Sequence, residues 1–93
     1  MAGSALPSIE KAVAALKAQG AREVYLFGSA ARGTLRPDSD VDIAVSGLAP
    51  QVFFLAMSKA SDALGRPLDL VDLDEDTPFA RFLRDKGELL RVG

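Results

Sequence analysis

The chain has 93 residues, of which 48% are hydrophobic, and a net charge of −2 from 11 basic and 13 acidic side chains. These values suit one folded domain over residues 1–93. The net negative charge produces no overall positive potential that would attract nucleic acid, so we expect no direct nucleic acid binding. Cysteine and histidine are absent, which excludes disulfides, thiolate or imidazole metal sites and a histidine base. Any metal ion must bind through oxygen ligands, as Mg²⁺ does.

Nothing in the sequence indicates a membrane-spanning segment or an export signal. No apolar run approaches the roughly 18 residues that span a bilayer. Residues 1–7 lack the basic and apolar regions of a secretory signal. We therefore expect a cytoplasmic protein with no membrane partner, in which residues 1–7 form a loose tail.

Apolar spacing, β-favouring runs and glycine stops predict helices that alternate with strands. In chain order the expected elements are a helix from residues 7–8 to Gly20, strand 24–27, short helix 29–32, strand 41–46, helix 50–64, strand 68–73, a helix from 77 to Gly87, and a final strand or docked tail at 89–92. The last helix carries Phe79, Phe82 and Leu83 on its apolar side. This order predicts a small sheet with helices packed on it, in the α/β (α+β) class.

The helix expected at 50–64 is unusually apolar, since residues 52–57 are apolar in succession. A helix that is apolar on nearly all sides needs more burial than a two-layer domain easily supplies. Phe53 and Phe54 cannot both face one core, because adjacent helical residues point about 100° apart. One of them packs under a neighbouring loop, or the stretch belongs to a partner interface, and the sequence leaves both open.

Two aspartates lead into the second strand. Asp40 and Asp42 are two residues apart, so their side chains share a face, opposite the core-facing apolar residues. Two ionised carboxylates side by side need a cation between them or access to water, and a divalent metal supplies that charge. In strand 68–73 the leucines beside Asp69 point to the opposite face, as the apolar neighbours of Asp42 do, whereas Asp72 shares the face of those leucines. We therefore expect Asp69 to be the third ligand, and Asp72 to be a solvated residue at the strand end.

A Gly-Ser turn precedes Asp40 and Asp42 in the sequence. Gly28 lets the backbone approach a phosphate closely, and Ser29 lies where the short helix begins. Arg32 and Arg36 are candidates to stabilise triphosphate charge, and Asp69 to accept the nucleophile's proton. Each feature alone also has an ordinary structural explanation: a helix cap, a strand edge, solvent-facing arginines. The aspartates around Asp40 match only the start of an EF-hand calcium loop, because the glycine and the final glutamate that such a loop needs are absent.

Together, these features resemble the signature of a known protein family. The sequence Gly28-Ser-Ala-Ala-Arg-Gly33, followed by Pro37-Asp-Ser-Asp-Val-Asp-Ile43, resembles the signature of the polymerase β nucleotidyltransferase superfamily. The short Gly-Ser-x-Ala-Arg-Gly form is similar to its minimal, MNT-type members. The stretches 68–73 and 86–90 are similar to their third-carboxylate strand and C-terminal ending. The resemblance covers about residues 23–92.

The resemblance implies a polymerase β-like fold: a small mixed sheet with helices packed on one side. It implies Asp40, Asp42 and Asp69 as ligands of Mg²⁺, with two ions expected, and Gly28 and Ser29 as phosphate-binding residues for an NTP, most simply ATP. The missing acceptor domain implies a partner, in this family an all-helical HEPN-type toxin. The chain would then be an antitoxin that transfers AMP to a partner tyrosine, or a binding module that neutralises its partner without catalysis.

Overall fold

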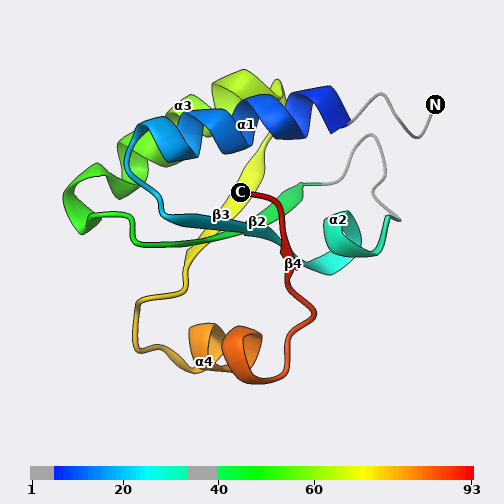
Figure 1. The fold of residues 1–93 in the computed structure, drawn as a ribbon, viewed down its shortest axis with the longest axis vertical. Coiled ribbons are helices and arrows are strands. Elements are labelled where there is room, and N and C mark those ends of the chain that lie inside the picture. Colours follow the sequence, from blue (N-terminus) through cyan, green and yellow to red (C-terminus); the bar gives the residue numbers. More distant parts are fainter. Residues whose placement is uncertain (1–5, 34–39) are drawn as a thin grey trace.

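The structure, a computed structural model, describes residues 6–33 and 40–93 (Figure 1). Its described elements follow the expected order. They are α1 (Leu6–Ala18), β1 (Glu23–Leu26), α2 (Gly28–Arg32), β2 (Val41–Ser46), a 3₁₀ turn (Pro50–Val52), α3 (Phe53–Leu64), β3 (Leu68–Asp72), α4 (Pro78–Asp85) and β4 (Leu90–Arg91). No helix in these parts of the chain is long and apolar enough to cross a membrane.

The strands form one mixed sheet in the order β3-β2-β1-β4. The β1–β2 and β1–β4 pairs are antiparallel, whereas β2 and β3 are parallel. Parallel neighbours need a crossover connection, and α3 supplies it between β2 and β3. The C-terminal residues 89–92, which the sequence left as a strand or a docked tail, therefore contribute a short edge strand.

Helices α1 and α3 cover one face of the sheet, and α4 lies on the other (Figure 1). Alternate residues of each strand serve the two faces. The larger core joins both helices to one face of the sheet through fully buried side chains such as Leu16, Val24 and Ile43. The smaller core lies under α4 and contains Phe27, Ala44, Leu73 and Leu83. Helices on both sides correct the expectation of a sheet covered on one side only.

Most boundaries shift by one to three residues from those expected. Helix α1 begins at Leu6, so the end of the expected tail is helical, and residues 1–5 lie outside the described part of the chain. Residues Pro50–Val52 form a 3₁₀ turn, and the α-helix starts only at Phe53. Pro50 opens that turn because its fixed φ suits a helix start and its missing N–H is not needed there.

The apolar run at the start of α3 is only partly buried. The helix faces the core through small residues, Ala56 and Ala60, together with Leu64. Phe54 keeps 74% of its surface exposed and Leu55 keeps 51%. Phe53 is half-buried and packs edge-on against Phe54 with their ring centroids 5.5 Å apart. No described loop covers Phe54, so this end of α3 presents apolar surface to solvent.

Candidate active site

The parallel pair β2–β3 places two aspartates side by side. Asp42 and Asp69 are register partners, flanked by Val41 opposite Leu68 and Ile43 opposite Leu70. The flanking residues face the α1–α3 core, so both aspartates project on the opposite face, the one that carries α4. This juxtaposition agrees with the alternation argument that favoured Asp69 over Asp72. Asp72 instead accepts a hydrogen bond from the backbone N–H of Asp74 at 2.9 Å.

The surroundings of Asp42 disfavour its charged form. Partial burial raises the pKa of this carboxyl above its ordinary value of 3.8. The neighbouring Asp69 raises the pKa further, through its charge and through a hydrogen bond between the two carboxyl groups, and the charge of Asp40 acts in the same direction. The Arg32 guanidinium opposes these effects. A site that holds like charges this close favours the binding of a cation.

Gly28 brings the start of α2 against the same carboxylate. Its φ is +63°, and a Cβ at this position would overlap Asp42 Oδ2. The backbone N–H of Phe27 also donates to the carbonyl of Asp42 at 3.1 Å, which ties the turn to β2. Glycine is therefore required twice, for the left-handed backbone and for the close approach. Ser29 follows in the first turn of α2, half-buried.

The remaining expected site residues are placed less completely. Asp40 is exposed just before β2, near enough for its charge to act on Asp42, and Arg32 is exposed at the end of α2. Arg36 falls in residues 34–39, outside the described part of the chain. Within residues 6–33 and 40–93, no group of three or more acidic side chains is close enough to hold a metal ion as it stands. The structure thus brings together two of the three expected ligands, Asp42 and Asp69.

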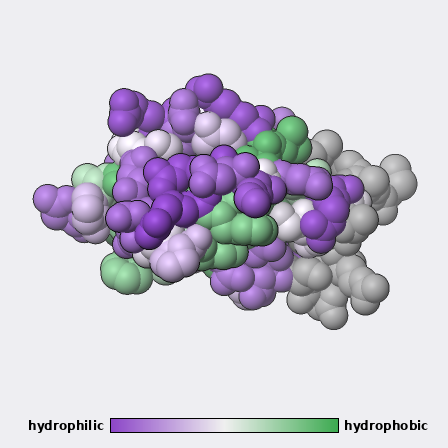
Figure 2. Space-filling model, turned by 90° about the horizontal axis from the view of Figure 1, so that it is seen from below, coloured by the Kyte–Doolittle hydropathy of each residue, from purple (hydrophilic) through white to green (hydrophobic). Residues whose placement is uncertain are grey.

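A pocket that the sequence did not reveal adjoins Gly28 and Arg32. It has a volume of about 300 Å³, and its other lining residues include Phe27, Phe79 and Phe82. Phe79 and Phe82 of α4 are 51% and 55% exposed. The space-filling view from the α4 side shows hydrophobic surface, in green, among the hydrophilic residues of this face (Figure 2). We call this the aromatic pocket.

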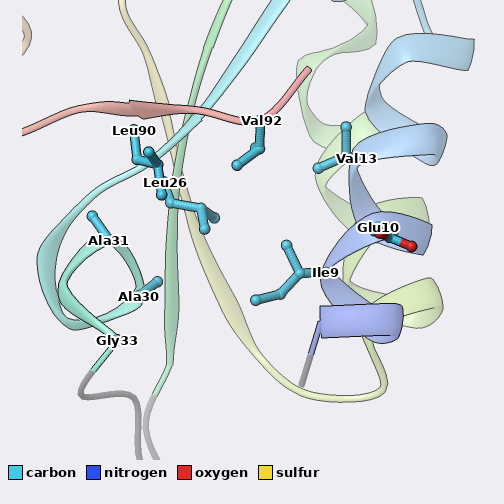
Figure 3. Close-up of a pocket in the computed structure, with 9 residues that line it drawn as sticks. All are labelled: Ile9, Glu10, Val13, Leu26, Ala30, Ala31, Gly33, Leu90 and Val92. Atoms are coloured by element: carbon cyan, nitrogen blue, oxygen red, sulfur yellow. The ribbon is translucent and has the colours of Figure 1, made fainter. Parts of the chain in front are cut away.

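A second pocket lies on the side of α1. It has a volume of about 470 Å³ and lies between α1, α2 and the end of the chain. Figure 3 shows Ile9 and Val13 of α1 on one side of it and Leu26, Leu90 and Val92 on the other. Among the described residues that line it, Glu10 carries the one charge. Asp40, Asp42 and Asp69 are not among its described lining residues, so this pocket is separate from the paired carboxylates.

Comparison with known proteins identifies the family. The family model described as "Polymerase beta, Nucleotidyltransferase" matches residues 10–91. The chain belongs to this nucleotidyltransferase family. The match includes both aspartate strands and the Gly28 turn, and the mixed sheet with its packed helices has the polymerase β-like fold. The resemblance stated from the sequence is therefore confirmed.

Solved structures of similar proteins agree with this assignment. A crystal structure of a toxin–antitoxin with AMP-PNP matches with a TM-score of 0.67 and 30% identity, over 86% of this chain and 69% of that one. A minimal nucleotidyltransferase matches with a TM-score of 0.67 and 25% identity, over 85% of each chain. The toxin–antitoxin MntA–HepT matches with a TM-score of 0.61 and 26% identity, over 88% and 68%. No curated protein sequence gives a match.

Proposed function

We propose that the protein is a Mg²⁺-dependent nucleotidyltransferase that moves a nucleoside monophosphate, AMP from ATP, onto a hydroxyl of a partner protein. The partner would be an all-helical HEPN-type toxin, with this chain as its antitoxin. The observation that carries the proposal is the pairing of Asp42 with Asp69 beside Gly28. The likeness to toxin–antitoxin structures, one of them with an ATP analogue, supports the partner and the nucleotide.

The donor set fits a divalent cation. Asp42 and Asp69 offer carboxylate oxygens from adjacent strands, and their mutual repulsion is relieved by positive charge. Asp40 would complete the ligand set. Bound there, Mg²⁺ would stabilise negative charge on the phosphates and favour ionisation of the attacking hydroxyl.

The chain's own groups would bind and orient the nucleotide. The backbone N–H groups of Gly28 and Ser29, at the start of α2, would donate to a phosphate, and the positive charge of Arg32 already acts on Asp42 in the same site. Arg36 is the further candidate from the sequence. In the transfer, the acceptor oxygen forms a bond to the α-phosphorus while the bond from that phosphorus to pyrophosphate breaks. The hydroxyl proton passes to Asp69, which is exposed and therefore accessible to an acceptor.

The test is a transfer assay with α-phosphate-labelled ATP, Mg²⁺ and the protein encoded next to this one. We expect label on that protein, and its loss in Asp42→Asn and Asp40→Asn. The matched control is Asp62→Asn, because Asp62 is an exposed aspartate on α3, the helix that covers the sheet face opposite to the one on which Asp42 and Asp69 project. Equal labelling by the wild type and Asp42→Asn would refute the assigned role of the pair.

A second candidate function is neutralisation by binding alone. The exposed Phe54 and Leu55 at the start of α3 favour it, since side chains of this size suit an interface. Phe54→Ala with Leu55→Ser would then release the toxin in a growth assay, while Asp42→Asn would still protect cells. The opposite pattern, protection lost only in Asp42→Asn, would establish that catalysis is needed.

A further inference from the structure

The aromatic pocket lies beside the elements assigned to the phosphates. Gly28 contributes to both places: it lines the pocket, and a Cβ added to it would overlap the Asp42 carboxylate. Arg32 also lines the pocket and acts electrostatically on Asp42. A molecule whose phosphates lie at Gly28 therefore has this pocket as immediate neighbouring space.

The pocket has an apolar floor and two aromatic walls. Phe27 and Leu83 are buried beneath it in the smaller core. Phe79 packs edge-on against Phe27, with ring centroids 6.0 Å apart and planes at 66°, so one wall is held in place from below. Phe82 lies one helical turn further along α4 and is more than half exposed. Each ring thus keeps a large area free for a ligand.

The rim of the pocket is charged. Its lining includes Lys86 and Glu88, which follow α4, and Arg32 at the end of α2, and all three are exposed. A flat group that is apolar on its faces and polar at its edges matches a pocket with aromatic walls and a charged rim. The volume of about 300 Å³ is at the small end for ligand pockets, which suits one ring system and not a long peptide segment.

We propose that Phe79 and Phe82 stack on the nucleobase of the nucleoside triphosphate whose phosphates bind at Gly28. This inference rests on the proposed function, which supplies the nucleotide, and it adds the position of the nucleobase. Stacking on phenylalanine discriminates poorly among bases, because every base has a π-face. Any choice among NTPs then depends on the rim residues Lys86 and Glu88.

The experiment compares two ligands, ATP and inorganic tripolyphosphate, each with Mg²⁺, by isothermal titration calorimetry. Phe82→Ala and Phe79→Ala are expected to weaken ATP binding about 5- to 150-fold, the range for losing one base–aromatic stack. Tripolyphosphate has no base, so its affinity should stay within twofold of the wild type. Phe82→Tyr should restore ATP affinity, because it restores an aromatic face.

Phe54→Ala is the matched control, because Phe54 is an even more exposed phenylalanine, on α3. Unchanged ATP affinity in Phe79→Ala and Phe82→Ala would overturn the inference and would indicate that the two rings contact a protein partner instead. Equal weakening of ATP and tripolyphosphate would also overturn it, because the rings would then act only by shaping the phosphate site. A wild type that binds neither ligand would refute the proposed function itself.

Discussion

The close approach of Gly28 to Asp42 can be tested by adding one methyl group. In Gly28→Ala the new Cβ would overlap Asp42 Oδ2 and lie 3.4 Å from its Cγ, at a φ of +63°. Two free-energy costs add. An alanine in the left-handed region costs about 1 kcal/mol, and displacing the Asp42 side chain from its rotamer costs about 1 kcal/mol more. We expect a loss of about 2 kcal/mol in the free energy of unfolding.

The matched control separates the two costs. Gly65 has a φ of +78° and nothing within 4 Å of an added Cβ, so Gly65→Ala should lose only the backbone cost of about 1 kcal/mol. Removing the obstructing carboxylate with Asp42→Ala should reduce the effect of Gly28→Ala to the same level. The double-mutant cycle therefore predicts a coupling of about 1 kcal/mol between the two positions.

Thermal unfolding of the metal-free protein is a sufficient assay. A domain of this size shifts its Tm by about 4–8 °C per kcal/mol, so Gly28→Ala should melt roughly 10 °C below the wild type and Gly65→Ala about half as far below. Equal shifts for the two alanine variants, unchanged by Asp42→Ala, would refute the contact between Gly28 and the carboxylate.

Two further predictions concern charge and helix capping. The raised pKa of Asp42 means that the folded protein keeps that proton to higher pH than the unfolded chain does. The stability of the metal-free wild type should therefore fall as the pH rises from 3.8 towards the raised value, and then stay at the lower level. Asp42→Asn should flatten this part of the curve of Tm against pH, and an equally steep fall in the variant would contradict the assigned cause. Thr77 caps α4, its Oγ1 accepting the backbone N–H of Ala80 at 3.1 Å, so Thr77→Ala should cost about 1 kcal/mol in urea unfolding. A change below a few tenths would mean that the hydrogen bond adds nothing to stability.

The acidic pair was predictable because it depends on local alternation. Val41 and Ile43 mark the core-facing side of β2, and Leu68 and Leu70 mark that side of β3, so Asp42 and Asp69 had to share the other side once the strands were neighbours. That the strands pair in parallel, with these two residues directly opposite, is a long-range property. No local pattern in the sequence fixes it.

The aromatic pocket was not predictable from the same reasoning. Phe79, Phe82 and Leu83 form one apolar side of a helix by spacing, and the sequence placed all three on it without distinguishing them. In the structure, α4 rests on a small core, so Ala80 and Leu83 are buried while the two phenylalanines remain half exposed. Periodicity indicates which side of a helix is apolar, but the size of the facing core decides how much of that side is buried.

The acidic turn after β3 was also missed. Asp74 accepts hydrogen bonds from the backbone N–H of Gly47, at 2.6 Å, and from Ser46 Oγ, at 3.1 Å. It thereby joins the ends of β2 and β3. Its position in a polar, solvent-exposed turn gave no indication of a structural role, because that role depends on a turn 27 residues earlier in the chain.

The register of β2 and β3 has a consequence for how the site comes into existence during folding. Asp42 and Asp69 become neighbours only through the parallel pairing on either side of α3. Strand pairings between segments this distant in sequence form late in folding, because the chain loses the entropy of loop closure before it gains any favourable contact. A nascent or partly unfolded chain therefore holds separate carboxylates, and cation binding at the proposed site would report that the β2–α3–β3 unit has folded. Slow amide exchange in these two strands should accordingly accompany cation binding.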